Sequence, residues 1–166
     1  EKGVDKAIEI ATSVGMPLKI AAKVDPSDEQ YYDNVIRPLL NNPLVEYLGE
    51  IAQEQKSRFL GNAAALLFPI CWPEPFGLVM IEAMACGTPV IALRNGSVDE
   101  VLIDGKTGFV CDSIEEMKCA IDRLGEIDRA VCRLHVIRSF SVDIMARNYE
   151  SVYNQILGME GRGTEE

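Results

Sequence analysis

The chain has 166 residues, of which 48% are hydrophobic, and this is enough for one compact domain with a core but not for a second full domain. Its formal net charge of −10 argues against a nucleic-acid-binding protein, because such a surface needs basic side chains to displace counterions from phosphates. Any phosphate ligand must therefore be held locally.

Apolar residues at helical spacing predict a first helix over residues 4–14, which Gly15 ends, and a short apolar run over 18–24 predicts a strand. A second helix is expected over 28–40, ended by two asparagines and a proline. A strand over 45–48 follows, and then a helix over 53–62. The first half of the chain therefore alternates helix and strand.

The second half continues the alternation, beginning with an unbroken apolar run that is typical of a parallel strand covered on both faces. Its expected elements are a strand over 63–70, a helix over 77–86, a strand over 88–93, a short helix over 98–103, a strand over 108–111 and helical structure from Ser113 onward. Short connections between alternating elements predict a Rossmann-like open parallel sheet with helices on both faces. Such a sheet binds ligands beyond the carboxyl ends of its strands.

The loop after the 63–70 strand has the chemistry of a binding site. Gly77 allows a tight entry into the next helix, whose first backbone amides, in residues 76–79, would attract an anion such as a diphosphate. Glu74 precedes these amides and Glu82 lies within the otherwise apolar helix, where we expect it to be buried with a partner or to face a ligand. Taken singly, Glu74 could equally cap the helix and Glu82 could bond to backbone.

The complete loop and helix sequence is more specific than either glutamate taken alone. Glu74 and Glu82, with seven residues between them, resemble the E-x7-E signature of family four retaining glycosyltransferases. The runs over residues 76–78, 82–90 and 104–108 are also similar to that family's sequence. The segments that resemble the family follow one another in the family's order over roughly residues 2–153.

The resemblance implies the GT-B architecture, in which two Rossmann-like domains face a cleft. Residues 1–157 would be the C-terminal, nucleotide-sugar-binding domain, truncated at its N-terminus. It also implies that Glu74 contacts the transferred sugar and that Glu82 contacts the ribose. The backbone amides that would meet the sugar and diphosphate are those of Phe76, Gly77, Leu78 and Val79.

Lys2 resembles the lysine of the family's G-R-x5-K-G segment, whose two basic residues neutralise the diphosphate leaving group. The arginine and the strand that normally precede this lysine would lie upstream of Glu1. Ile51 corresponds to the base-contacting loop, with Lys56 near the edge of the base. Lys23, at the rim of the first strand, could reach a phosphate or the sugar, although Lys56 and Lys23 have equally good interpretations as solvated charges.

The expected activity is transfer of a sugar from a nucleotide diphosphate sugar to an acceptor hydroxyl with retained configuration. No cofactor and no metal are needed if Lys2, the arginine and the helix amides stabilise the leaving group, and no Asp-x-Asp pair is present to hold a metal. The isolated segment is expected to be inactive, because its partners are the donor and the acceptor domain of the same chain. A GT-B nucleotide-sugar epimerase and a non-catalytic nucleotide-binding module remain alternatives.

Other features receive no functional role. The cysteines are odd in number and lack a CxxC pair, so we expect most of them to be small core residues in a cytoplasmic protein. The segment has no long apolar run, so membrane contact is expected only through the acceptor domain. Residues 158–166 are expected to be a disordered tail, and His135 to be a helix-face residue. Asp99 replaces a proline that is usual in the family, and Arg94 lies at the functional rim.

Overall fold

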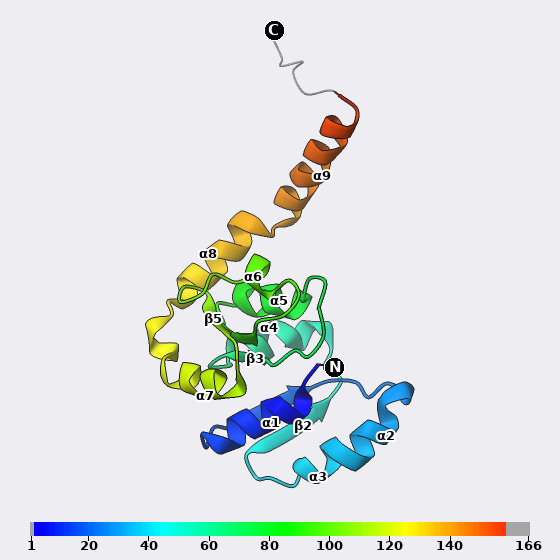
Figure 1. The fold of residues 1–166 in the computed structure, drawn as a ribbon, viewed down its shortest axis with the longest axis vertical. Coiled ribbons are helices and arrows are strands. Elements are labelled where there is room, and N and C mark those ends of the chain that lie inside the picture. The colour runs from blue at the N-terminus through cyan, green and yellow to red at the C-terminus, as the bar shows by residue number, and fades with distance from the viewer. Residues whose placement is uncertain (1, 159–166) are drawn as a thin grey trace.

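The computed structural model describes residues 2–158, which form an α/β fold of parallel strands flanked by helices (Figure 1). The strands are β1 (Leu18–Ala21), β2 (Val45–Gly49), β3 (Leu66–Phe68), β4 (Val90–Leu93) and β5 (Gly108–Cys111). The helices of four or more residues with α geometry are α1 (Val4–Ser13), α4 (Gln53–Gly61), α5 (Leu78–Ala85), α6 (Val98–Val101), α7 (Ile114–Asp122), α8 (Arg129–Ser139) and α9 (Val142–Ile156). Short helical segments are η1 (Pro26–Asp28), α2 (Glu29–Tyr31), η2 (Tyr32–Ile36), α3 (Arg37–Leu39) and η3 (Leu124–Glu126).

The strands pair in two separate sheets, not in the single sheet that the sequence suggests. β1 pairs with β2, in parallel and with Leu18 opposite Val45. β3, β4 and β5 form a second parallel sheet in that order. The prediction of an open parallel α/β layout is confirmed, and α4 carries the chain from β2 in one sheet to β3 in the other.

Three predicted strands are shorter in the structure. β1 ends at Ala21 and not at residue 24, and proline explains one boundary of β3 and one of β4. β3 ends at Phe68 because Pro69 has no N–H to donate to a neighbouring strand. β4 begins at Val90 for the same reason, since Pro89 precedes it, although the Pro89 carbonyl still accepts a 2.9 Å hydrogen bond from the amide of Leu66. Proline thus sets the end of β3 and the start of β4, and the ladder pairs Leu66–Phe68 with residues 90–92.

The prediction of one regular helix over 28–40 is wrong. The segment is a succession of a 3-10 turn, a short α turn, a π segment over Tyr32–Ile36 and a last α turn. Pro38 lies within the last turn, where its missing N–H and its ring disrupt the regular hydrogen-bond ladder of an α-helix. A local π segment immediately before such a residue relieves this conflict.

The hydrophobic core surrounds the β3–β4–β5 sheet. α5 contributes Met80, Ala83 and Met84, all fully buried, and the β4 residues Val90 and Ile91 are also inaccessible to solvent. α8 packs against α5 from the outer side. α5 is therefore fixed between a sheet and a helix, and its N-terminal end is held in place at the carboxyl ends of the strands.

Three of the five cysteines belong to the core or pack against it, so the expectation that most of them are core residues is confirmed. Cys111 and Cys132 are buried, Cys86 is half-buried, and Cys71 and Cys119 are exposed. Burial, with a further contribution from the charge of Glu116, raises the pKa of the Cys111 thiol to about 11. Cys111 is therefore protonated near neutral pH and packs as a small apolar side chain.

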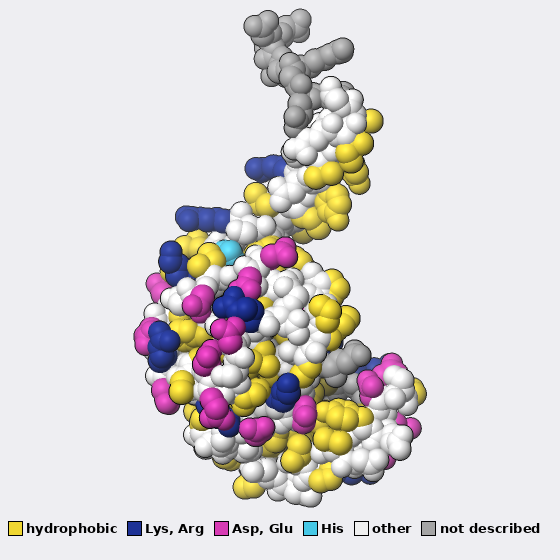
Figure 2. Space-filling model, viewed as in Figure 1, with side chains coloured by type: hydrophobic (Ala, Val, Ile, Leu, Met, Phe, Trp, Pro, Cys, Tyr) yellow, Lys and Arg dark blue, Asp and Glu magenta, His cyan; other side chains and the backbone are white. Residues whose placement is uncertain are grey.

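The last helix, α9, leaves the body of the domain. Figure 1 shows α9 projecting away from the rest of the molecule, and Figure 2 shows hydrophobic side chains along it. Helical structure from Ser113 onward is confirmed, with breaks between α7, η3, α8 and α9. The predicted tail over 158–166 lies, apart from Gly158, outside the described residues. No helix within residues 2–158 is both long and apolar enough to cross a membrane.

Candidate functional site

Glu74 is the centre of the polar groups that gather at the carboxyl end of β3. Its carboxylate accepts a hydrogen bond from Lys2 Nζ and a second one, of 3.2 Å, from Trp72 Nε1. Both donors contact the same oxygen, Oε2, and the Glu74 side chain is only 14% exposed. The structure thus brings together two predicted site residues that are 72 positions apart, and it leaves the other carboxylate oxygen of Glu74 without a hydrogen-bond partner among residues 2–158.

Lys2 is exposed and is held at this position by two interactions. Besides the ion pair with Glu74, its Nζ lies 4.9 Å from the centre of the Trp72 ring, which is a cation–π distance. Trp72 is half-buried and packs against the core. Its hydrogen bond to Glu74 was not foreseen. Trp72 therefore orients both charged groups of the site.

The N-terminal end of α5 lies next to Glu74. Gly77 precedes the helix with a φ of 74°, and a Cβ at this position would lie 2.5 Å from the Cε of Met80. Only glycine adopts such a backbone easily. The backbone N–H groups of Leu78 and Val79 have no hydrogen-bond partner within residues 2–158, and they carry the positive end of the helix dipole. These amides can bind an anion.

Glu82 lies one turn further along α5 and pairs with Lys56 of α4, with 3.3 Å between Nζ and Oε1. Glu82 was expected either to be buried with a partner or to face a ligand. It has a partner but is not buried, since both side chains are 38% exposed, and contact with a ligand stays a prediction. The core-facing side of α5 is occupied by its methionines and Ala83, so Glu82 faces the neighbouring α4 and solvent. Two predicted site residues, Glu82 and Lys56, are thereby in direct contact.

A groove of ≈ 1190 Å³ runs between the two sheets and reaches this site. Lys2, Ala22, Glu50 and Ile51 line it together with Val79 of α5. Ile51 is half-buried just after β2, at the position the resemblance implies. The groove therefore connects the N-terminal end of α5 with the carboxyl ends of β1 and β2.

Lys23 lies apart from this arrangement. It is exposed beyond β1, does not line the groove, and makes no ion pair within residues 2–158. The described residues also contain no group of three or more His, Cys, Asp or Glu side chains that could hold a metal ion.

The family model for group 1 glycosyl transferases matches residues 1–130, which is most of the chain. The chain belongs to the group 1 glycosyltransferases. Among curated relatives it is 31% identical, over 114 residues, to an uncharacterised glycosyltransferase of Methanocaldococcus jannaschii, a match that covers 68% of this chain and 31% of that protein. It is 32% identical over 120 residues to a D-inositol 3-phosphate glycosyltransferase of Nocardioides, covering 68% of this chain and 26% of the relative.

Solved glycosyltransferases share the fold. A glycosyltransferase involved in avilamycin A biosynthesis superposes with a TM-score of 0.75 at 26% identity, over 95% of this chain and 49% of that protein. Sucrose-phosphate synthase of Thermosynechococcus elongatus gives 0.74 at 26% identity, over 96% of this chain and 43% of the other. HepE of Anabaena, crystallised with UDP-glucose, gives 0.75 at 20% identity, over 92% of this chain and 45% of that protein, which shows the shared fold. The chain thus spans about half the length of these structures and less of the curated relatives.

The loop after β4 packs against the backbone of Glu74, a contact that the sequence did not predict. Gly96 has a φ of 52°, and a Cβ there would lie 2.4 Å from the carbonyl oxygen and 2.5 Å from the amide nitrogen of Glu74. The amide of Ser97 donates a 3.0 Å hydrogen bond to the same carbonyl. The Asn95-Gly96 pair signals a turn in the sequence, but nothing local identifies the segment against which the turn packs.

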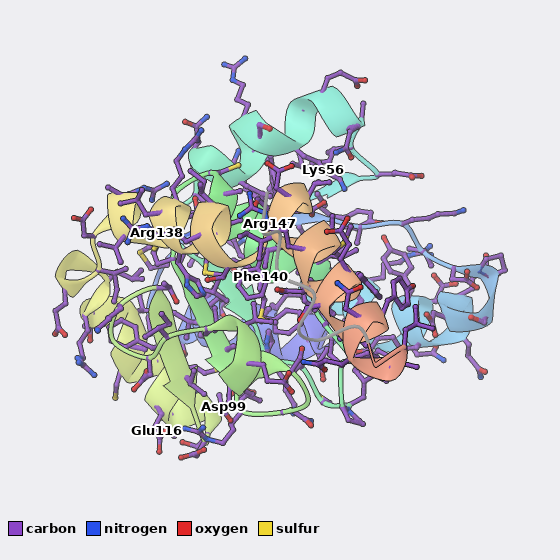
Figure 3. All side chains as sticks on the ribbon, turned by 90° about the horizontal axis from the view of Figure 1, so that it is seen from above. Lys56, Asp99, Glu116, Arg138, Phe140 and Arg147 are labelled. Carbon is purple, nitrogen blue, oxygen red and sulfur yellow. The ribbon has the colours of Figure 1, made fainter. Side chains whose placement is uncertain are left out.

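Arg94, which the sequence places at the functional rim, forms ion pairs within the domain. It binds Asp112 through Nε at 2.7 Å and also pairs with Asp99. These two carboxylates raise the pKa of the guanidinium above its ordinary value. Figure 3 shows Asp99 at the opposite end of that view from Lys56. Asp99 is thus one of the two carboxylates that pair with Arg94.

Phe76 connects the site to the C-terminal helices. Its ring meets Phe140 edge-on at 5.9 Å, and Phe140 lies at the junction of α8 and α9 that Figure 3 labels. His135 stacks edge-on against Phe140 at 5.3 Å, and its Nε2 lies 2.9 Å from the carbonyl oxygen of Val101. His135 therefore has a packing role, as expected, and Phe140 is a residue that the sequence did not single out.

Proposed function

We propose that this chain is the donor-binding half of a retaining glycosyltransferase that moves a sugar from a nucleotide diphosphate sugar to an acceptor hydroxyl. The observation that carries the proposal is the convergence of Lys2 and Glu74 beside the amides of Leu78 and Val79, which have no hydrogen-bond partner among the described residues. A cation and helix amides bind a diphosphate, and a carboxylate binds sugar hydroxyls. The E-x7-E pair, with Glu82 at the ribose, supplies the second end of the donor site. Calorimetry of the full-length protein against a panel of nucleotide sugars tests donor binding directly.

The contact between Lys2 and Glu74 supports an exchange of partners on donor binding. The diphosphate would take Lys2 and the α5 amides, and the hydroxyls of the sugar would take the released carboxylate oxygen of Glu74. Trp72 keeps its hydrogen bond to Glu74 during the exchange, because its indole N–H needs a single acceptor. The ion pair thus holds both side chains near their places before the donor arrives.

The proposed chemistry follows from the same charges. The bond between the anomeric carbon and the diphosphate oxygen breaks, and its electron pair leaves on the diphosphate. A bond forms between that carbon and the acceptor hydroxyl oxygen, whose proton passes to an oxygen of the departing diphosphate. Lys2 and the α5 amides stabilise the charge on the leaving group, and Glu74 stabilises the positive charge that develops on the sugar ring. No residue of this scheme requires a metal or a cofactor.

We also propose that the protein is located in the cytoplasm.

If Glu82 binds the ribose, Glu82→Gln in the full-length protein weakens donor binding by about tenfold, or about 1.4 kcal/mol, because a charged acceptor is lost. The turnover number at saturating donor should change little, since the ribose does not react. Calorimetry gives the dissociation constant, and initial rates give the turnover number.

Glu46→Gln is a matched control for this change. Glu46 is likewise a glutamate in an ion pair, with Lys19 at 2.7 Å, but it lies on the exposed face of β2. The control variant should bind donor as the unchanged protein does. Equal affinity for Glu82→Gln and the unchanged protein would remove Glu82 from the donor site.

The proposal assigns donor binding to this domain and sugar transfer to the two domains together, which gives a second expected result. Residues 1–166 alone should bind donor weakly and transfer no sugar, whereas the full-length protein should do both, because the acceptor site and the closure that excludes water need the other domain. Transfer of sugar from a radiolabelled donor measures this difference. Full turnover by residues 1–166 would contradict the proposed division.

A further inference from the structure

The backbone amides of residues 76–79 form the anion-binding end of the loop between β3 and α5. None of them has a hydrogen-bond partner within residues 2–158. Among the described residues, hydrogen bonds from other segments reach this loop at Glu74 and not at Pro75 or Phe76. Side-chain packing must therefore hold the stretch that follows Glu74, because no backbone ladder does.

The side chain of Phe76 supplies such packing. Its ring meets the ring of Phe140 edge-on, with 5.9 Å between the centroids and 75° between the planes. An aromatic pair in this geometry stabilises by more than the area that it buries. Phe140 is half-buried, packs against the core and lies where α8 ends (Figure 3). The contact thus ties the start of α5 to the end of α8.

His135 in turn holds Phe140. The two rings lie 5.3 Å apart, with 84° between their planes. The Nε2 atom of His135 lies 2.9 Å from the carbonyl oxygen of Val101, the last residue of α6. Because a carbonyl oxygen accepts and cannot donate, Nε2 carries the proton of this hydrogen bond. His135 is therefore anchored to a buried point of the core.

Helix α6 connects two fastenings of the same loop. At its start, the amide of Ser97 donates a 3.0 Å hydrogen bond to the carbonyl oxygen of Glu74. At its end, Val101 anchors the aromatic contacts that reach Phe76. Both terminal valines of α6, Val98 and Val101, are inaccessible to solvent, so the helix is fixed in the core. The loop is thus held at two points by one short buried helix.

We propose that Phe140 is a positioning residue for the donor site and that His135 anchors it. Phe140 holds Phe76 and thereby keeps the amides of residues 76–79 directed at one point, where they bind the diphosphate of the donor. Amides that are already ordered lose less conformational freedom on binding, so packing behind the loop raises affinity. The inference rests on the proposed function for its ligand, and it assigns part of the donor affinity to two residues that touch neither donor nor acceptor.

Order parameters of backbone amides in the free full-length protein test the positioning without a ligand. Phe140→Leu keeps an apolar side chain but removes the ring, so the order parameters of residues 76–79 should fall from about 0.85 to below about 0.6. Unchanged values in the β3–β4 ladder show that the variant is folded. Residues 76–79 as rigid in Phe140→Leu as in the unchanged protein overturn the proposal.

Two further variants complete this measurement. Tyr32→Leu is the matched control, because Tyr32 is also half-buried and pairs with another ring, that of Tyr47, at 5.7 Å. It should leave residues 76–79 rigid. Phe76→Leu removes the same contact from the loop side, and Phe76 is 39% exposed, so this variant keeps the fold even where Phe140→Leu does not. Rigid amides in Phe76→Leu would likewise count against the proposal.

Calorimetry with UDP, GDP and ADP tests the consequence for binding. Phe76→Leu and Phe140→Leu should each weaken the tightest of the three complexes by about fivefold, the strength of one aromatic pair. Because both changes remove one contact, the double variant should also lose about fivefold. Independent effects would multiply to about 25-fold and, like unchanged affinity in both single variants, would overturn the proposal.

The role of His135 and that of the site are tested separately. His135→Ala should weaken the same complex by about threefold, because Phe140 then loses one of its two aromatic neighbours. Unchanged affinity would show that His135 does not anchor Phe140. If the unchanged protein binds none of the three diphosphates, the proposed function fails, and the order parameters still decide whether Phe140 positions the loop.

Discussion

Glu74→Gln in the full-length protein is expected to lower the turnover number by about 10²–10³, the usual cost of removing one preorganised charge or donor from a transition state. The amide is isosteric and can still accept the hydrogen bond from Trp72 Nε1, so the loop should keep its shape. What is lost is the negative charge that faces the sugar ring. Initial rates at saturating donor and acceptor measure the effect.

Glu126→Gln provides the control for this variant. Glu126 is also an ion-paired glutamate, held by Arg123 at 2.8 Å, and it lies in η3 away from the site. Its turnover should equal that of the unchanged protein. A Glu74→Gln variant with unchanged turnover and unchanged thermal stability would mean that Glu74 only shapes the loop.

Gly96→Ala is expected to lower the turnover number by about a hundredfold, although Gly96 touches neither donor nor acceptor in the proposed scheme. The added methyl group would overlap the backbone of Glu74, so the loop that carries Glu74 must move. A displacement of about 1 Å at a reacting site costs about that much. Initial rates and a thermal melt of the same variant separate misplacement from unfolding.

Gly15→Ala isolates the effect of the steric overlap. Gly15 has a φ of 70°, similar to that of Gly96, but a Cβ there would have no atom within 4 Å. Both variants carry the same kind of left-handed backbone strain, about 1–2 kcal/mol, and only Gly96→Ala displaces Glu74. Equal turnover in the two variants would show that the β4–α6 loop does not position Glu74.

The layout of elements could be predicted because it depends on local pattern. The apolar run ending at Ile70 and the glycine that precedes α5 indicate a buried strand and a tight helix start, and both are present. The predicted first and last residues of the strands were less accurate, because they depend on which strands pair with each other. The division into two sheets could not be predicted, because periodicity reports which face of a strand is buried and not which edge is paired.

The convergence of Lys2, Glu74 and the start of α5 could be predicted from the sequence, and the other contacts of these residues could not. Lys2, Glu74 and the α5 amides converge because the carboxyl ends of parallel strands share one edge. The hydrogen bond from Trp72 and the packing of Gly96 against Glu74 join segments far apart in the chain, and no spacing indicates such contacts. Glu82 was expected to be buried with a partner or to face a ligand because its helical neighbours are apolar. Its pair with Lys56 depends on the position of α4, which no local pattern indicates.

A crystal structure of the full-length protein with a nucleotide diphosphate sugar tests the central claim most directly. The account predicts the diphosphate within hydrogen-bond distance of the Leu78 and Val79 amides, with Lys2 turned from Glu74 to the phosphates and Glu82 on the ribose. A donor bound elsewhere, with the pair between Lys2 and Glu74 intact and Glu82 still on Lys56, would contradict it.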